Sequence, residues 1–405
     1  MNSILDGIRV IEWAHWHVGP YCADVLARMG AEVIKIEDRV HGDALRGHKT
    51  TSGISLMHPA GHDVQFHFEM VNVNKKSITV DVKKPGGNEV VRRLVEKSDV
   101  FVTNFQNPEA VGLDYESLKG SNPRLVYASA NGFGKRGPDA KTPSYDLLGL
   151  ARSGAMFATG EAGTPPMPPP GNMSDRATGV YLAFGVVSAL FAREKSGVGQ
   201  EVFVSQLGAM INLVEVGMML YHMHGMQLPR SSRAGAMNPL WNWYRCGDGR
   251  WIAIAFIQSD RYWPHVCTLL GVPELEKDSR FSGMAARQKN RAELVSLLDG
   301  VFASKTYAQW EELFRRDGDV IFAPVNTSLE VFSDPQVVAN QYVIDMDHPA
   351  LGRIKFPGFP IEFSENPAVK PVAAPQYGQN TEEVLLEVCG YDWPKIVELK
   401  EQQVI

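Results

Sequence analysis

The stretch that decides the fold is residues 8–37, which read IRVIEWAHWHVGPYCADVLARMGAEVIKIE. Residues 8–12 have the composition of a buried strand, and residues 21–29 place apolar side chains at helical spacing. Gly30 ends this helix, and residues 32–37 form a second apolar strand. A strand, a helix and a strand in succession predict a βαβ unit, so we expect an α/β fold with a parallel sheet.

The alternation of strands and helices continues outward from this unit to about residue 205. Further strands are expected at 77–82, 99–104 and 124–130, and the last helix near 380–389. Around residue 223 the composition changes to Pro, Gly, Ser and Arg, and a second unit then begins with a strand at 251–256. Because 405 residues exceed one ordinary domain, we expect two domains.

Composition excludes several classes of function. The net charge of -6 argues against nonspecific binding of nucleic acid. The N-terminus lacks the basic and apolar regions of a signal peptide, and the apolar run 180–192 is shorter than the roughly 20 residues that cross a bilayer. The four cysteines lie far apart without metal-ligand spacing, which is typical of a reducing compartment. We therefore expect a cytoplasmic protein without a nucleic-acid or membrane partner.

One carboxylate precedes the most apolar helix of the chain. Asp175 follows the stiff proline segment 168–170 and stands before the uncharged run 180–192. Aspartate is a preferred helix N-cap, so a purely structural role is one interpretation. The second is a reactive carboxylate, which the helix N-terminus would keep ionised and which attacks an activated acyl group. The neighbouring residues do not decide between these roles, and the two are compatible.

Other patterns indicate weaker candidates. Residues 132–137 match the G-x-G-x-x-G pattern of a dinucleotide site, but Pro138 follows and no apolar helix begins there. We interpret this motif as a glycine turn, or as backbone that lines a ligand. Seven of the eleven histidines lie in the first 67 residues without metal-ligand spacing, so we expect no metal and interpret His17 as polar pocket lining. Lys75 and Lys76 have two interpretations: they form a solvated basic turn, or they bind a phosphate group.

A series of short segments is distinctive through its order along the chain. The segments are Gly19-Pro20, Ala31 to Glu37, Gly42-Asp43 with Arg46, Asn72 to Ile78, Asn104-Phe105, Gly132-Phe133-Gly134, Gly137-Pro138, Tyr145-Asp146, Ser153-Gly154, Thr159-Gly160, Asp175 before Thr178-Gly179, and Gly197 to Gln200. In this order they resemble the family III CoA-transferases, the CaiB/BaiF family, from about residue 4 to residue 390.

The resemblance implies an enzyme whose nucleophile is Asp175. The carboxylate would attack the thioester of an acyl-CoA donor, giving a mixed anhydride and CoA thiolate. The thiolate would then form an aspartyl-CoA thioester, and an acceptor carboxylate would reverse these steps. Coenzyme A and acyl-CoA are substrates in this scheme, which needs no tightly bound cofactor and no metal. By motif match the CoA site would comprise His17, Val18, Arg39, Asn72, Val73, Asn74, Lys75, Asn104, Phe105, Asn131, Gly132, Phe133 and Gly134.

The resemblance also implies a Rossmann-like large domain built from both chain ends, with a smaller α+β domain between them. The expected bounds are 1–222 and 326–405 for the large domain and 223–325 for the small one. Similar proteins form interlocked homodimers, and a heteromer with a related subunit is the alternative. The chain departs from the family pattern after Phe105, where an arginine that usually follows is missing, so one phosphate contact is lost or moved.

Residue types near the expected pocket suggest the substrate. Aromatic and methionine side chains favour a bulky aromatic acid, with core packing as the alternative; they are Trp13, Trp16, Met57, Met237, Trp241 and Trp243. The nearby histidines suit a dicarboxylate, so we expect a small carboxylic acid acceptor such as an aryl-substituted succinate, with succinyl-CoA as donor.

Four alternatives stay open at this point. One is an isomerase that moves CoA within a single molecule, and another is an inactive partner subunit. An acyl-CoA racemase is disfavoured because Ser144-Tyr145-Asp146 lacks the histidine of the racemase branch, which proton transfer at the α-carbon would need. The last alternative, a nicotinamide oxidoreductase, is supported only by the glycine motif.

Overall fold

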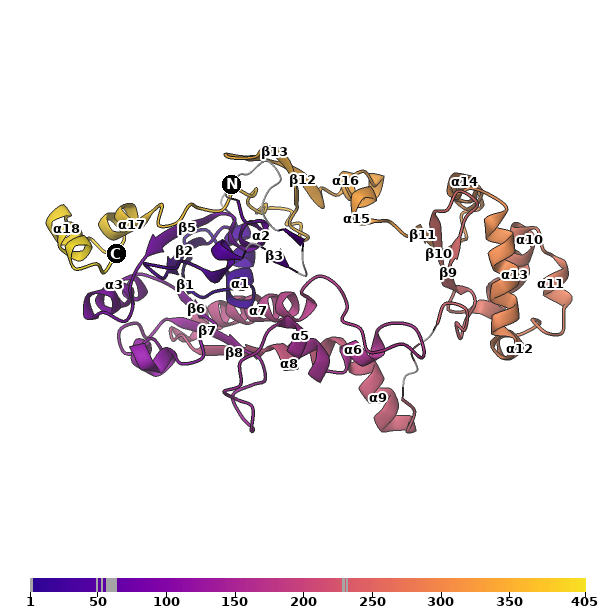
Figure 1. The fold of residues 1–405 in the computed structure, drawn as a ribbon, viewed down its shortest axis with the longest axis horizontal. Helices are drawn as coiled ribbons and strands as arrows, with labels where there is room; N and C mark the ends of the chain where they lie inside the picture. The colour runs from indigo at the N-terminus through magenta and orange to yellow at the C-terminus, as the bar shows by residue number, and fades with distance from the viewer. Residues whose placement is uncertain (1–2, 49, 52–53, 56–63, 228–229, 231) are drawn as a thin grey trace. The chain divides into compact units, whose positions relative to one another are not determined.

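A computed structural model describes residues 3–48, 50–51, 54–55, 64–227, 230 and 232–405 (Figure 1). The chain divides into two compact units, and each is described by itself. The first comprises Met1–Met156, Pro168–Met219 and Val338–Ile405, and the second comprises Phe157–Met167 and Leu220–Val337. Segment Phe157–Met167 thus packs with the second unit although it lies between two segments of the first.

The first unit is built on a six-stranded sheet with the strand order β5-β2-β1-β6-β7-β8. All neighbouring strands in it are parallel. This confirms the predicted βαβ unit and the mixed α/β class. The strands are β1 (Arg9–Trp13), β2 (Glu32–Glu37), β5 (Lys75–Thr79), β6 (Val100–Thr103), β7 (Val126–Asn131) and β8 (Glu201–Ser205).

Helices cover both faces of this sheet (Figure 1). On one face α1 (Val18–Arg28) and α7 (Met173–Ser196) bury apolar side chains such as Leu26 and Val186 against the strands. On the other face lie α3 (Pro85–Glu96), α4 (Tyr115–Lys119), α17 (Thr381–Glu387) and α18 (Trp393–Glu401). Burial on both faces explains why a central strand such as β6, which reads VFVT and is buried at every residue, is rich in apolar side chains.

Two helices begin differently from the sequence expectation. α1 begins at Val18, three residues early, because proline is tolerated in a first turn whose N–H groups have no partner inside the helix. α7 begins at Met173, and its N-cap is Asn172, with φ at +54° and no side-chain cap hydrogen bond. Asp175 is therefore the third residue of α7, and its interpretation as the N-cap is wrong.

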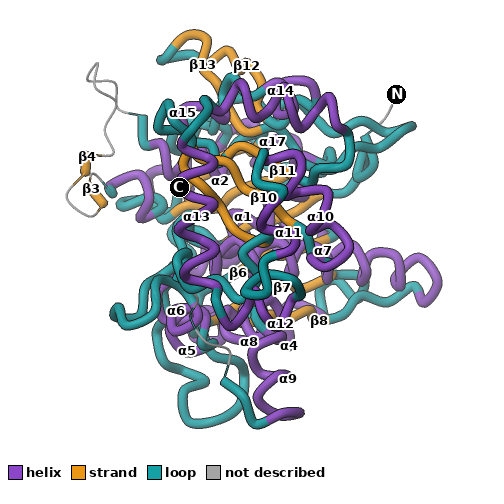
Figure 2. The backbone as a smooth tube through the Cα atoms, turned by 90° about the vertical axis from the view of Figure 1, so that its right-hand side faces the viewer, coloured by secondary structure: helices purple, strands orange, loops and turns teal. Residues whose placement is uncertain are grey.

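Shorter elements complete the first unit, including the antiparallel hairpin β12–β13 at the top of Figure 2. α6 and α9 span the sequence boundaries between the two units. The elements are η1 (Ala44–Gly47), β3 (Thr50–Thr51), β4 (Ile54–Ser55), α2 (Phe66–Asn72), η2 (Pro108–Val111), α5 (Asp146–Arg152), α6 (Ala155–Ala158), α8 (Gln206–Leu213), α9 (Glu215–His224), β12 (Val343–His348) and β13 (Gly352–Pro357).

The second unit has its own core around a three-stranded antiparallel sheet of order β11-β10-β9. Trp310, Phe302 and Tyr244 are buried at its centre. Its strands are β9 (Trp241–Arg245), β10 (Trp251–Ala255) and β11 (Phe322–Pro324). Its helices are α10 (Ser259–Leu270), α11 (Glu274–Lys277), α12 (Met284–Lys289), α13 (Arg291–Ala303), α14 (Tyr307–Asp317) and α15 (Ser328–Val331), and α16 (Pro335–Ala339) leads back to the first unit.

None of the described helices is both long enough and apolar enough to cross a bilayer.

Candidate active site

A cavity of about 290 Å³ lies where β1, β6, β7 and β8 end. Parallel α/β sheets bind ligands at this carboxyl edge, because the loops that follow the strands converge there. Seven of the residues expected at the site meet in its lining. They are His17, Val18, Asn104, Phe105, Asn131, Gly132 and Asp175, and they are joined by His15, Trp16, Gln106, Ala130, Pro143, Ser144, Tyr145 and Gln206.

The loop after β1 forms one wall of the cavity and is held from two sides. Asn104, directly after β6, accepts a hydrogen bond from the main-chain N–H of His15 (3.0 Å) and donates one to the carbonyl of the same residue (2.8 Å). The main-chain N–H of Trp16 donates to Asp43 Oδ1, and Trp16 has φ at +58°, in the left-handed region. Phe105 stacks on Trp13 with ring centroids 4.2 Å apart. These contacts fix the backbone that carries His15 to His17.

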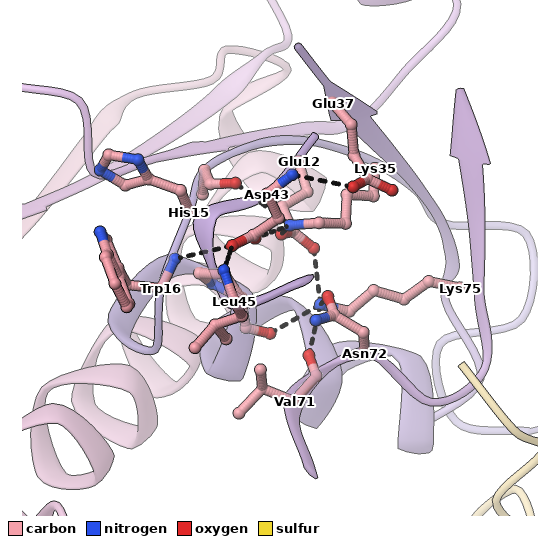
Figure 3. Close-up of polar contacts among 12 residues, drawn as sticks. Glu12, His15, Trp16, Lys35, Glu37, Asp43, Leu45, Val71, Asn72 and Lys75 are labelled. Carbon is pink, nitrogen blue, oxygen red and sulfur yellow. Dashed lines mark hydrogen bonds and ion pairs between the residues drawn. The ribbon is translucent and has the colours of Figure 1, made fainter. Parts of the chain in front are cut away.

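A buried ion-pair network lies beneath this loop (Figure 3). Glu12 bridges two ammonium groups, with Oε1 2.7 Å from Lys35 Nζ and Oε2 2.6 Å from Lys75 Nζ. Lys35 also pairs with Asp43 at 2.7 Å. Burial raises the pKa of Asp43, but Lys35 and main-chain N–H groups outweigh burial, so the net pKa is lowered. Asp43 therefore stays ionised and connects the network to Trp16.

Lys75 lies inside this network, away from the cavity. Its ammonium group donates to Glu12, to Asn72 Oδ1 and to the carbonyl oxygens of Pro20 and Val71. Burial lowers the pKa of Lys75, against the opposing effect of Glu12. All the hydrogen-bonding capacity of the ammonium group is thus used by the protein in this conformation.

The structure does not bring the remaining expected CoA contacts to the cavity. Asn72 and Val73 are fully buried, and Asn74 pairs through its main chain and side chain with Val372. Arg39 Nε donates to the main-chain oxygen of Ile405, 3.1 Å away. Asn74 and Arg39 thus join the N-terminal part of the first unit to its C-terminal segment.

The glycine turn after β7 is shaped by Asn131. Its side-chain oxygen accepts a hydrogen bond from the N–H of Gly134 at 2.7 Å, and its amide donates to the Gly134 carbonyl. At Gly132 a Cβ would lie 2.1 Å from Ser144 Cβ, so only glycine fits. Phe133 and Gly134 lie in this turn beyond the cavity lining. No helix begins here, which agrees with the interpretation as a glycine turn.

His17 in the cavity lining pairs with a second histidine, His67. His17 is buried, and its Nε2 lies 3.3 Å from Nδ1 of His67. Burial, followed by the neighbouring His67 and Arg176, lowers the pKa of His17 to about 3. At neutral pH the His17 imidazole is therefore uncharged and offers one N–H donor. Among the described residues no cluster of three or more His, Cys, Asp or Glu is suited to a metal ion.

Asp175 contributes a carboxyl group to the cavity lining, and the pKa of this group is raised. It is 8 % exposed, and Gln206 Nε2 donates to its Oδ1 at 2.6 Å. Its main-chain N–H donates to Asp146 Oδ1 at 3.0 Å. Burial and then the negative charge of Asp146 raise the pKa of Asp175 to about 7. The helix N-terminus therefore does not lower the pKa of Asp175: Asp146 accepts the first-turn N–H group, and burial dominates.

Gln206 and Asp146 are site residues that sequence analysis missed as such. Gln206 directly follows β8, so its position after a parallel strand was the available signal. Asp146 belongs to the family segment Tyr145-Asp146 and to the triplet compared with the racemase branch, and neither pattern indicates a contact with Asp175. The aromatic residues expected at the pocket lie in different places. Trp16 lines this cavity, whereas Trp13 is buried in the core. Met57 lies outside the described residues.

The second unit contains a larger apolar cavity of about 1020 Å³. Met237, Trp241 and Trp243, three residues expected to line a substrate pocket, meet there with Met226, Ile257 and Met284. Polar groups are few in this lining and include Asn238, Asn242 and Gln227.

A buried carboxylate in a cavity at the carboxyl edge of a parallel sheet is typical of a ligand site in an α/β protein. The sequence then identifies the family: residues 5–381 match CoA-transferase family III, and the chain belongs to that family. It is accordingly an enzyme, and CoA thioesters are its substrates.

Known relatives cover the full length of the chain. It is 32% identical to a cinnamoyl-CoA:phenyllactate CoA-transferase of Clostridium sporogenes, over 100% of this chain and 98% of the relative. It is 31% identical to a succinyl-CoA:glutarate CoA-transferase of Homo sapiens, over 100% and 91%. The solved structure of a CaiB/BaiF family protein from Brucella suis superposes with a TM-score of 0.83 at 32% identity, covering 96% of this chain and 100% of that one.

Proposed function

We propose that this enzyme transfers coenzyme A between carboxylic acids through covalent intermediates on Asp175. The observation that carries the proposal is the state of this carboxylate. Asp175 is buried at the cavity, Gln206 holds its Oδ1, and its Oδ2 has no hydrogen-bond partner among the described residues. A desolvated carboxylate with one uncommitted oxygen is a competent nucleophile toward a thioester.

The proposed cycle passes through two intermediates. Oδ2 attacks the acyl carbonyl carbon of the donor, the carbon–sulfur bond breaks, and CoA leaves as a thiolate. The thiolate attacks Asp175 Cγ and releases the donor acid, which leaves the aspartyl-CoA thioester. The acceptor carboxylate then repeats both steps in reverse order. Restricted water is essential throughout, because hydrolysis would destroy either intermediate.

We propose that the CoA thioester lies along the loops that follow β1, β6 and β7. His17, Val18, Asn104, Phe105, Asn131 and Gly132 line the cavity beside Asp175, which supports this assignment. The assignment of Arg39, of Asn72 to Lys75, and of Phe133 and Gly134 to this site stays a prediction. For Lys75 and Arg39 it requires a conformation that releases their present protein partners.

We further propose an acceptor with an aryl group, such as an aryl-substituted dicarboxylic acid, and succinyl-CoA as donor. Trp16 and Tyr145 line the cavity beside Asp175 and support an aromatic group, since aryl rings pack well against aromatic side chains. The relatives named for phenyllactate and for succinyl-CoA with glutarate support the two substrate classes.

A screen of donors against acceptors tests this function. The purified enzyme is mixed with succinyl-, acetyl- or cinnamoyl-CoA and a set of carboxylic acids, and new thioesters are identified by mass spectrometry. We expect phenylsuccinate or phenyllactate to exceed glutarate or acetate by about tenfold in kcat/KM, equivalent to about 1.4 kcal/mol of aryl contact. Preference for short aliphatic acids would contradict the proposed acceptor.

We expect kcat/KM to rise with pH through about 7. Only the ionised Asp175 attacks, and burial and Asp146 raise its pKa to about 7, so the reactive fraction increases between about pH 6 and about pH 8. Asp146→Asn removes the charge but retains an oxygen for the Asp175 N–H, so its pH profile is expected to shift to lower pH. A pH profile that stays flat across this range would contradict the assignment.

We also propose an interlocked homodimer, or a heteromer with a related subunit, in the cytoplasm. α7 presents Val180, Phe184 and Phe191 at 49%, 70% and 66% exposure, which supports a partner surface on this helix. The four cysteines are free and buried, which supports a reducing compartment. Size-exclusion chromatography with light scattering tests the assembly.

A further inference from the structure

The position of Gln206 is fixed by contacts of the main chain around it. It is the first residue of α8, whose N-cap Ser205 accepts a hydrogen bond from Gly208 N–H at 3.0 Å. The next residue, Leu207, donates its main-chain N–H to the Gly132 carbonyl at 2.9 Å. The side chain is 3 % exposed. Helix α8 and the glycine turn after β7 therefore fix where the Gln206 amide lies.

A close approach of α5 and α7 completes this support. At Gly149 of α5 a Cβ would lie 2.2 Å from Ser174 Oγ and 3.0 Å from Gln206 Cβ. Only glycine lets α5 pack this tightly, and the packing brings Asp146, at the start of α5, onto the main-chain N–H of Asp175. The main chain and side chain of Asp175 are thus each fixed by a separate contact.

We propose that Gln206 is a catalytic residue whose amide stabilises the oxyanion formed on Asp175 itself. The inference rests on the proposed covalent mechanism and adds a donor for its second step. Nε2 lies 2.6 Å from Oδ1, so an N–H donor already points at the oxygen on which the negative charge develops. Because Oδ2 becomes the bridging oxygen of the mixed anhydride, Oδ1 becomes the carbonyl oxygen of the group that the CoA thiolate attacks.

The electron flow in that step places negative charge on Oδ1. The thiolate sulfur forms a bond to Cγ, and the π electrons of the Cγ–Oδ1 bond move onto Oδ1. The tetrahedral intermediate collapses when Oδ1 reforms its double bond, the Cγ–Oδ2 bond breaks, and the donor acid departs as a carboxylate with Oδ2. Attack of the acceptor carboxylate on the thioester repeats this sequence with the thiolate as leaving group. Gln206 faces the charged oxygen in both events.

In the first step the negative charge does not build up on the oxygen that Gln206 contacts. When Oδ2 attacks the donor thioester, charge is drawn away from Asp175, and the oxyanion forms on the donor carbonyl instead. A hydrogen bond to Oδ1 lowers the pKa of Asp175, but once the carboxylate is ionised this bond gives no advantage in the first step. Loss of the Gln206 donor should therefore slow formation of the aspartyl-CoA thioester and spare formation of the mixed anhydride.

Gln206→Met tests this asymmetry, because methionine has similar volume and no N–H donor. The variant is mixed with excess succinyl-CoA, quenched at millisecond to minute times, and examined by intact-protein mass spectrometry for an acyl adduct and a CoA adduct. The expected result is CoA-adduct formation slower by about 100- to 1000-fold. At about pH 9, where Asp175 is ionised in both enzymes, the acyl adduct or its hydroxylamine product should form within a few fold of the wild-type rate and accumulate.

Gln402→Met is the matched control. Its amide also donates to a carboxylate, Glu398 Oε1 at 2.9 Å, but at the exposed end of α18. This control should form both adducts at wild-type rates. Thermal unfolding checks that the Gln206→Met enzyme is folded.

Three outcomes would be decisive against one proposal or the other. CoA-adduct formation at the wild-type rate in Gln206→Met would overturn the oxyanion role. Equal slowing of both adducts would also overturn it, because it would show that Gln206 only orients the nucleophile. If wild-type enzyme transfers CoA without either adduct on Asp175, the covalent mechanism itself fails, independently of Gln206.

Discussion

Replacement of Asp175 by asparagine is expected to abolish CoA transfer, with a loss of about a thousandfold or more in kcat. Asparagine preserves the size of the side chain and an oxygen for the Gln206 amide, 2.6 Å from Oδ1 in the wild type. It removes the anionic oxygen that attacks the thioester, so no mixed anhydride forms. The measurement is thioester exchange between succinyl-CoA and an aryl acid, followed by mass spectrometry.

Stability separates this loss from misfolding. The pKa of Asp175 is raised on folding, to about 7, so ionisation of this group opposes folding as the pH rises from the unfolded-state pKa toward the folded one. Asp175→Asn should therefore match or exceed the wild-type melting temperature at about pH 8, with a smaller difference at about pH 5. Asp139→Asn, a substitution at an exposed carboxylate, is the activity control. Undiminished transfer by Asp175→Asn would disprove the nucleophile.

Removal of Glu12 is expected to have the largest effect on stability, about 3 to 5 kcal/mol. This carboxylate is completely buried and contacts both Lys35 and Lys75. In Glu12→Leu, Lys35 retains Asp43, but Lys75 loses its only ion-pair partner among the described residues. An unpaired buried ammonium group must either stay charged at high cost or lose its proton. Chemical denaturation of the wild type and the variant measures the difference.

The pH dependence of that loss tests its cause. Deprotonation of Lys75 relieves the uncompensated charge, so the stability deficit of Glu12→Leu should shrink as the pH rises. Asp345→Ala breaks an exposed ion pair with Arg353 and Lys355 and should change stability little. A Glu12→Leu enzyme as stable as Asp345→Ala would show that the network contributes nothing.

The sheet and its order of elements were predictable because apolar periodicity directly reflects burial. Residues 8–37 specify β1, α1 and β2 by their own pattern. The strand expected at 77–82 lies instead at Lys75–Thr79, because two lysines at its start obscure the apolar pattern. One of these, Lys75, is buried through ion pairing, which no hydropathy pattern can reveal.

The candidate site was predictable in part for a similar reason. Residues directly after strands, such as His17 after β1, Asn104 after β6 and Gly132 after β7, meet at the carboxyl edge as parallel topology requires. The environment of Asp175 was not predictable, because it depends on Asp146 and Gln206, which lie 29 and 31 residues away in sequence. A sequence pattern does not contain the desolvation that raises the pKa of this carboxyl group.

The division of the first unit into separate chain segments has a consequence during protein synthesis. Val384 and Leu399 complete the core cluster that Val90 and Leu94 of α3 begin, yet the whole of Leu220–Val337 is translated in between. At about 5 to 20 residues per second, the ribosome needs roughly 6 to 24 s for that insertion. During this interval α17 and α18 do not yet cover their part of this core, so the nascent chain presents apolar surface to chaperones before the enzyme can close it.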